Sequence, residues 1–168
     1  MNDPYRVCIV CSGNICRSPM GEIVLRRRFE EAGLTGKVVV DSAGTGGWHV
    51  GNGADPRTVR ALRTGGYDGS AHRAQQFDDT WVSERDLVLV ADCGHLRDVR
   101  RLAAGDDTAH VRLLRSFDPV AVEAGTLDLD DPYYGDDAGF DRCLQEVEAA
   151  ADGIVAFVTD DLERRRRA

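Results

Sequence analysis

The stretch YRVCIVCSGNICRSP, residues 5–19, predicts a strand that leads through a short polar loop into a helix. Its first seven residues are mostly β-branched or apolar, which is typical of a strand. Ser18 and Pro19 then provide a capping hydroxyl and a proline, both of which are common where a helix begins. We therefore expect a strand at 5–11 and a helix at 18–33.

The rest of the chain alternates short β-branched runs with longer amphipathic ones, which predicts a parallel sheet flanked by helices. The further predicted strands are 37–41, 86–91 and 111–114, and the further predicted helices are 55–65, 78–84, 93–103 and 139–163. A glycine-rich loop at 42–54 and an acidic loop at 118–138 lie between them. A chain of 168 residues has the length of one domain. The sequence therefore predicts a single α/β domain over residues 1–168, with helices on both faces of the sheet.

Charge and hydropathy exclude several classes of protein. The formal net charge is −8 and the sequence pI is about 4.9, which disfavours non-specific electrostatic binding to the phosphates of nucleic acid. No apolar run reaches the roughly 18–20 residues that span a bilayer, and the first residues lack the features of a signal peptide. We expect a soluble cytoplasmic protein that binds neither nucleic acid nor membrane; export without a signal peptide stays open.

The cysteines and the single lysine narrow the chemistry further. Five cysteines at irregular spacings do not suggest a disulfide framework. Cys8 and Cys11 lie three apart on one strand, so their side chains should face opposite sides of the sheet and no metal pair is expected. Lys37, the only lysine, has no glycine-rich loop before it, which excludes a nucleotide-binding loop of the kinase or triphosphatase type.

The loop between the first strand and helix has the character of an anion site. In an open parallel sheet, ligands bind where strands end and helices begin. Backbone N–H groups from Ser12 to Arg17 can converge on one point beside the positive end of the helix. Gly13 permits close approach, and Asn14 tolerates left-handed dihedrals. The same field should stabilise a thiolate at Cys11, which predicts a nucleophile inside a phosphate site.

These residues resemble the low-molecular-weight protein tyrosine phosphatases, specifically their actinobacterial members. The likeness covers nearly the whole chain, through the motifs Cys11-Ser-Gly-Asn-Ile-Cys-Arg-Ser-Pro19, Asp41-Ser-Ala-Gly-Thr45, Trp48-His-Val-Gly51, His72-Arg-Ala74, Ser116-Phe-Asp-Pro119 and Asp131-Pro-Tyr-Tyr-Gly135. The resemblance implies a four-stranded parallel sheet of order 2-1-3-4. It also implies hydrolysis of phosphotyrosine through a phosphocysteine intermediate, without metal or cofactor.

The resemblance assigns the reacting groups. Cys11 is the expected nucleophile, Arg17 the phosphate clamp and Asp131 the general acid and base. An aryl phosphate needs a proton for its departing phenolate, and a carboxyl group held beside the rigid Pro132 can supply it. The expected phosphate-binding residues are those of the loop: Ser12, Gly13, Asn14, Ile15, Cys16, Arg17 and Ser18.

The resemblance also assigns residues that do not react. A hydrogen-bonded network that supports the loop is expected from Asn14, Ser18, Ser42 and His72. Aromatic walls that select phosphotyrosine are expected from Trp48, Tyr133 and Tyr134. Ser18 is expected both to cap the helix and to donate to the Cys11 thiolate, and Cys16 is expected to form a reversible disulfide with Cys11. The expected partners are phosphotyrosine-containing proteins and a tyrosine kinase acting on Tyr133 or Tyr134, with the protein itself a monomer or weak dimer.

Two other functions fit the same loop. A thioredoxin-coupled arsenate reductase shares the fold but needs a further pair of closely spaced cysteines, whereas Cys93 and Cys143 lie fifty residues apart. A catalytically silent phosphotyrosine-binding module would not need an intact nucleophile, clamp and acid. Ser12 and Cys93-Gly94 depart from residues common in the family and leave the fine specificity open.

Overall fold

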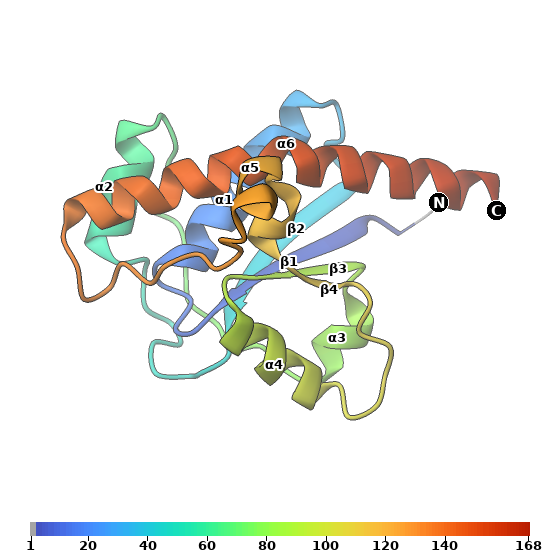
Figure 1. Cartoon of the computed structure of the whole chain (residues 1–168), viewed down its shortest axis with the longest axis horizontal. Helices are drawn as coiled ribbons and strands as arrows, with labels where there is room; N and C mark the ends of the chain where they lie inside the picture. Colours follow the sequence, from blue (N-terminus) through green and yellow to red (C-terminus); the bar gives the residue numbers. More distant parts are fainter. Residues whose placement is uncertain (1–2) are drawn as a thin grey trace.

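A four-stranded parallel sheet forms the centre of the computed structural model, which describes residues 3–168 (Figure 1). Its strands are β1 (Tyr5–Cys11), β2 (Val38–Gly44), β3 (Leu87–Val90) and β4 (Val111–Leu113). They lie in the order β2-β1-β3-β4 and every pair is parallel, so the expected fold class and strand order are confirmed.

Both faces of the sheet are buried, and β1 alternates between them. Ile9 and Cys11 contribute to an apolar cluster on one face, while Cys8 and Val10 contribute to a separate cluster on the other. This is why the sequence of β1 is an almost continuous apolar run. The same alternation places Cys8 and Cys11 on opposite faces, as expected.

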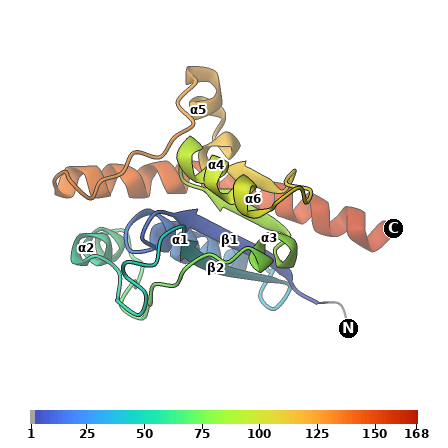
Figure 2. The same ribbon diagram turned by 90° about the horizontal axis from the view of Figure 1, so that it is seen from below.

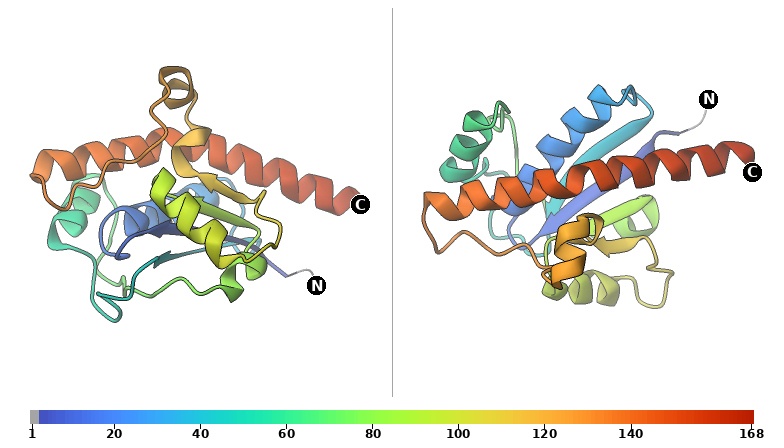
Figure 3. Two further views of the ribbon diagram at one scale, coloured as in Figure 1. Left: turned by 60° about the horizontal axis from the view of Figure 1, so that its bottom comes forward. Right: turned by 45° about the horizontal axis from the view of Figure 1, so that its top comes forward.

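Helices cover the two faces unequally (Figures 1 and 3). The larger cluster is covered by α1 (Arg17–Glu31), α2 (Pro56–Thr64) and the long α6 (Asp137–Arg167). The smaller cluster is covered by α3 (Thr80–Glu84) and α4 (Cys93–Leu102). The Tyr5 hydroxyl donates to Asp161 at 2.8 Å, so the start of β1 and the end of α6 lie together (Figure 3).

The acidic loop predicted at 118–138 is partly helical, and that prediction is wrong in its first third. A 3₁₀ turn (Leu114–Phe117) follows β4, and α5 (Pro119–Ala124) projects from the body of the molecule (Figure 2). Asp118 accepts a hydrogen bond from Val120 N at 3.0 Å and Pro119 begins the helix, a local capping signal that the acidic composition masked.

One strand and one helix extend further than the sequence predicted. Strand β2 runs on to Gly44, three residues beyond the predicted end, because its last residues pair with the end of β1. Helix α6 begins before the predicted residue 139 because Asp136 caps it by accepting from Gly139 N, and it runs past the predicted end at 163 to Arg167. Among residues 3–168, no helix combines the length and the apolar character that crossing a membrane requires.

Candidate active site

The loop predicted to bind an anion joins the end of β1 to the start of α1, at the opposite end of the sheet from the two chain ends (Figure 1). Asn14 has φ 59°, a left-handed conformation that asparagine tolerates better than most residues. The loop lies directly against β2, where a Cβ at Gly44 would stand 2.6 Å from Ser12 O. Only glycine at position 44 leaves room for this approach.

The Cys11 sulfur is buried at the base of the loop and lies 3.0 Å from Ser18 Oγ. Ser18 Oγ also accepts a hydrogen bond from Asn14 Nδ2 at 2.7 Å. Because a hydroxyl has one hydrogen to give, the Ser18 hydrogen is free to point at the sulfur. The Ser18 hydroxyl is therefore placed as a hydrogen-bond donor to the Cys11 sulfur.

Ser18 does not cap α1, and that part of the prediction is wrong. The helix begins at Arg17, the cap position belongs to Cys16, and no side chain caps it. The serine hydroxyl is taken by the sulfur and by Asn14 instead. The first backbone N–H groups of the helix therefore stay open toward the loop, as an anion-binding helix start requires.

The residues expected to support the loop are brought together. Asn14 Nδ2 donates to Ser42 Oγ at 2.9 Å as well as to Ser18, and Asn14 Oδ1 accepts from Gln75 N at 2.9 Å. His72 Nε2 lies 2.7 Å from the Asn14 carbonyl oxygen. Every polar atom of the Asn14 side chain is thus satisfied, which fixes the loop's strained residue in place.

The Arg17 guanidinium is held rigidly beside the loop with only 3% of its side chain exposed. Its Nη1 donates to Asp92 Oδ2 at 2.9 Å and to Leu129 O at 2.8 Å, while Nη2 lies 3.7 Å from Asp131 Oδ2. Burial raises the pKa of Asp92, but His95 and Arg17 outweigh it, so the pKa lies below its usual value. Asp92 therefore stays ionised as the arginine's partner.

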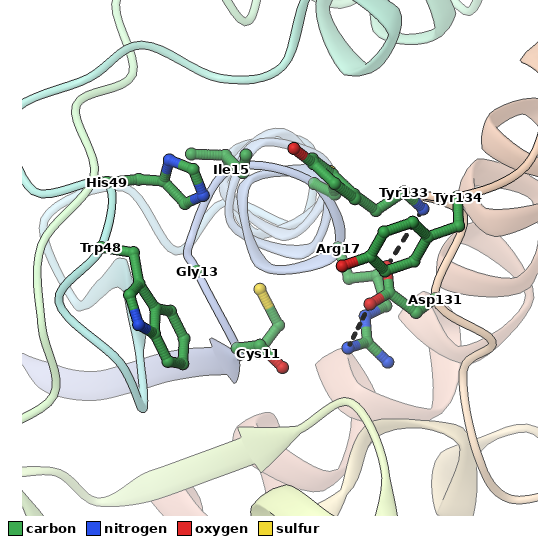
Figure 4. A pocket seen from close by; sticks show the side chains of 11 residues that line it. Cys11, Gly13, Ile15, Arg17, Trp48, His49, Asp131, Tyr133 and Tyr134 are labelled. Atoms are coloured by element: carbon green, nitrogen blue, oxygen red, sulfur yellow. Dashed lines mark hydrogen bonds and ion pairs between the residues drawn. The ribbon is translucent and has the colours of Figure 1, made fainter.

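A cavity of about 400 Å³ opens above Cys11 (Figure 4). Trp48 and His49 stand on one side, and Tyr133 and Tyr134 stand on the other. Trp48 is 74% exposed and Tyr134 is 92% exposed, so both rings are accessible to a ligand and neither belongs to the hydrophobic core. The lining comprises Cys11, Ser12, Gly13, Ile15, Cys16, Arg17, Trp48, His49, Asp131, Tyr133 and Tyr134.

Asp131 reaches this cavity from the segment between α5 and α6. Its Oδ1 accepts from Tyr133 N at 3.1 Å, and its carboxylate is 43% exposed toward the opening. Arg57 on α2 holds the same segment by donating to Tyr133 O at 3.0 Å and to Gly135 O at 3.3 Å. A carboxyl group therefore faces the sulfur across the cavity from a part of the chain distant in sequence.

The sequence prediction missed several residues that shape the site. Asp92, the cap residue of α4, accepts a hydrogen bond from Arg17, and His95 on α4 bonds to Ser12. Arg57 holds the segment that carries Asp131, and the His49 ring lies over Gly13. The position of Asp92 directly after a parallel strand was a signal that could have placed it at the same edge of the sheet as Cys11. Among the described residues, 3–168, no group of three or more His, Cys, Asp or Glu side chains could hold a metal ion.

The fold and the site together define a class: α/β phosphatases that place a cysteine and an arginine in one phosphate-binding loop between a strand and a helix. The family model described as low molecular weight phosphotyrosine protein phosphatase matches residues 6–166. The chain therefore belongs to the low-molecular-weight protein-tyrosine-phosphatase family and is a phosphatase of that type.

Relatives and solved structures agree with this membership. A low molecular weight protein-tyrosine-phosphatase of Streptomyces coelicolor is 58% identical over 162 residues, which cover 96% of this chain and 98% of the relative. Low molecular weight protein-tyrosine phosphatase A of Mycobacterium tuberculosis is 44% identical over 166 residues, covering 98% of each chain. The crystal structure of YfkJ from Bacillus subtilis superposes with a TM-score of 0.88 at 30% identity, covering 95% of this chain and 98% of YfkJ.

Proposed function

We propose that the protein hydrolyses phosphotyrosine in proteins by way of a phosphocysteine intermediate on Cys11. The observation that carries this proposal is that Cys11, Arg17 and Asp131 line one cavity, although Asp131 lies more than one hundred residues further along the chain. A nucleophile, a phosphate clamp and an acid are the three groups that an aryl phosphate ester requires.

In the first step the Cys11 thiolate attacks phosphorus. The S–P bond forms as the bond from phosphorus to the phenolic oxygen breaks, and Asp131 gives its proton to the departing oxygen. The arrival of a phosphate dianion beside this carboxyl group favours its protonated form. Arg17 and the loop N–H groups hold the equatorial oxygens, so the loop acts by positioning and electrostatics.

In the second step water attacks the phosphocysteine. Asp131, now ionised, accepts a proton from the water as the new O–P bond forms and the S–P bond breaks. The Cys11 thiolate leaves, stabilised by the Ser18 hydroxyl at 3.0 Å. Inorganic phosphate departs, and neither step calls for a metal ion because Arg17 and the amides supply the positive charge.

The cleft walls suit a phenyl ring. Trp48 stands across the cavity from Tyr133 and Tyr134, and a ring entering between them would bury apolar area on both sides. Phosphoserine is too short to reach the Cys11 sulfur while using these walls. We therefore assign Trp48, Tyr133 and Tyr134 to substrate binding and selection.

Cys16 is the proposed partner of Cys11 in a protective disulfide. Both thiols are free and both line the cavity. Burial, Asp55 and Cys11 raise the pKa of Cys16 to about 12, so the Cys16 thiol is protonated at neutral pH and reacts slowly with peroxide, and Cys11 is the proposed first site of oxidation. Peroxide converts Cys11 to a sulfenic acid with loss of water or alcohol, and the Cys16 thiol then displaces water to form the S–S bond.

The wider setting is proposed as follows. Residues 1–168 act as one catalytic domain, as a monomer or weak dimer in the cytoplasm, on phosphotyrosine-containing proteins. Tyr133 and Tyr134 are proposed as targets of a tyrosine kinase. Phosphorylation there adds about −1.5 to −2 charges at the mouth of an anion site, which would repel substrate. Mass spectrometry of the protein after incubation with a tyrosine kinase tests this.

Hydrolysis of p-nitrophenyl phosphate in the presence of EDTA tests the central proposal. The wild type should be active, Cys11→Ser inactive, and Asp131→Ala slowed about 10²-fold or more. The loss in Asp131→Ala should be larger for phosphotyrosine, because its phenolate is a poorer leaving group than p-nitrophenolate. Unchanged turnover in Cys11→Ser would reject the mechanism.

The two alternative functions give different outcomes in parallel assays. Thioredoxin-dependent reduction of arsenate by the wild type would favour the reductase. Binding of a phosphotyrosine peptide with no release of phosphate would favour the silent binding module. Capture of phosphoproteins by Asp131→Ala, abolished by an excess of inorganic phosphate, would identify substrates that occupy the phosphate site.

A further inference from the structure

A buried histidine touches the phosphate loop on the side away from the Asn14 network. His95, on the first turn of α4, is 4% exposed. Its Nε2 lies 2.8 Å from Ser12 Oγ, and Ser12 is the residue directly after the nucleophile. Its Nδ1 lies 3.3 Å from Asp92 N and 3.1 Å from Asp92 Oδ1. The imidazole therefore joins the first loop residue to the carboxylate that holds Arg17.

The contact with the Asp92 backbone N–H favours one tautomer of the neutral ring. This N–H can only donate, and Nδ1 of His95 accepts from it in the tautomer that carries no hydrogen on Nδ1. The hydrogen of the neutral ring is then on Nε2, which donates to Ser12 Oγ. Asp92 Oδ1 accepts from His95 N at 3.1 Å, and its Oδ2 is left for Arg17 at 2.9 Å.

A second proton on the ring would change these contacts. With a hydrogen on Nδ1, the ring can no longer accept from Asp92 N, and the nearest acceptor is Asp92 Oδ1 at 3.1 Å. The carboxylate would then be shared between two cations, His95 and Arg17. Arg17 would lose part of the attraction that fixes its guanidinium beside the loop.

We propose that His95 is a positioning residue for the phosphate loop: when neutral it holds Ser12 and leaves Asp92 to Arg17, and when protonated it competes with Arg17 for Asp92. The proposal rests on the proposed function of the loop as the phosphate site. His95 touches no reacting atom and acts through Ser12 and Asp92.

The charges around His95 favour its neutral state at neutral pH. Burial makes the largest contribution and lowers the pKa of the ring, and Arg17 on α1 lowers it as well. Three carboxylates raise the pKa of His95: those of Asp92 at the cap of α4, Asp98 within α4, and Asp131 across the cavity. Together they do not outweigh burial. Protonation is therefore a response to acid, and it would appear on the acid side of the pH profile.

Four variants, one of them a control, separate the effect of the hydrogen bond from the effect of ring protonation. His95→Gln can place an N–H donor near the position of Nε2 but cannot be protonated, and His95→Ala removes the donor. His110→Asn is the matched control, because His110 is another partly buried histidine that bonds to a backbone carbonyl, that of Val82, outside the cavity. Ser12→Ala removes the acceptor from the other side.

The measurements are kcat and KM for p-nitrophenyl phosphate between about pH 4.5 and 8, together with the imidazole ¹⁵N shifts of the wild type. We expect the Nε2–H tautomer at neutral pH, and a fall in kcat/KM on the acid side that follows the titration of His95. His95→Gln should stay within about threefold of the wild type at pH 7.5 and lack that fall, whereas His110→Asn should retain it. His95→Ala should lose about three- to tenfold in kcat/KM at pH 7.5, the size of one hydrogen bond.

A double-mutant cycle adds a test that a purely structural role would not pass. Ser12→Ala and His95→Ala remove the same hydrogen bond, so the double variant should be no slower than the slower single variant. Additive losses, an Nδ1–H tautomer at neutral pH, or an unchanged acid-side fall in His95→Gln would each overturn the proposal. None of these outcomes affects the mechanism, which the Cys11→Ser variant tests separately.

Discussion

Gly44→Ala tests whether sub-ångström placement of the phosphate loop controls the rate. The new Cβ would lie 2.6 Å from Ser12 O, 3.0 Å from Gly13 C and 3.1 Å from Asn14 N, all backbone atoms of the loop. An ordinary contact begins at 3.4 Å, so either the loop or β2 must move by about 0.8 Å. Misplacement by about 1 Å can cost about 10²-fold in rate. We therefore expect kcat/KM for an aryl phosphate to fall about 10²-fold.

The stability of the Gly44→Ala variant and a control variant distinguish a displaced loop from a loss of folding. Overpacking of this kind costs about 1–3 kcal/mol, which a folded domain of this size survives. Gly139→Ala is the control, because its Cβ would make only ordinary contacts, the nearest 3.6 Å away at Pro132. Circular dichroism and thermal unfolding should show both variants folded at 25 °C. A folded Gly44→Ala variant with the kcat/KM of the wild type would refute the reasoning that loop position limits the rate.

Three further outcomes follow from contacts around the site. Ser18→Ala removes the hydroxyl 3.0 Å from the Cys11 sulfur, so alkylation of Cys11 by iodoacetate at pH 6 should slow about tenfold, the size of one hydrogen bond to a charged group; an unchanged rate would contradict this role. Trp48→Ala should raise KM for a phosphotyrosine peptide at least threefold and leave inhibition by inorganic phosphate nearly unchanged, as steady-state kinetics would show. Burial raises the pKa of Asp55, but hydrogen bonds from Arg57 outweigh it and the pKa lies below its usual value. The stability that Asp55 contributes is therefore fully present above about pH 4 and is lost as the pH falls through the lowered pKa, so urea unfolding should show Asp55→Asn less stable than the wild type at pH 7, with a difference that shrinks as the solution is acidified below about pH 4.

The charge at the centre of the site differs in sign from the charge of the whole protein. The chain carries a formal charge of −8, yet the centre of the site is a buried arginine with its backbone amides. Asp92 and Asp131 balance Arg17 in the free protein, at 2.9 Å and 3.7 Å. Two carboxylates from distant segments therefore share a single guanidinium.

Local capping signals explain two differences between the prediction and the structure. Asp118 and Pro119 begin α5, a helix that the acidic composition of the segment did not predict. At Ser18 the same kind of rule predicted a cap, but the hydroxyl bonds to Cys11 and Asn14. The sulfur lies seven residues away in the chain, and only the turn of the loop brings it within reach of the hydroxyl.

The sequence by itself predicted the parallel sheet and the position of the loop between its first strand and helix, because both depend on local periodicity and on residues within one short segment, from Tyr5 to Pro19. The strand order was predicted from the family resemblance, and the structure confirms it. Only the tertiary structure showed that Asp92 and His95 belong to the site, and that Asp131, expected there from the resemblance, lies 3.7 Å from Arg17. These three residues are more than seventy positions from Arg17 in the sequence, and they meet the loop because β3 and the segment before α6 end at the same edge of the sheet. The spacing of these residues in the sequence does not predict such contacts, because the contacts depend on how the strands and helices pack in the folded protein.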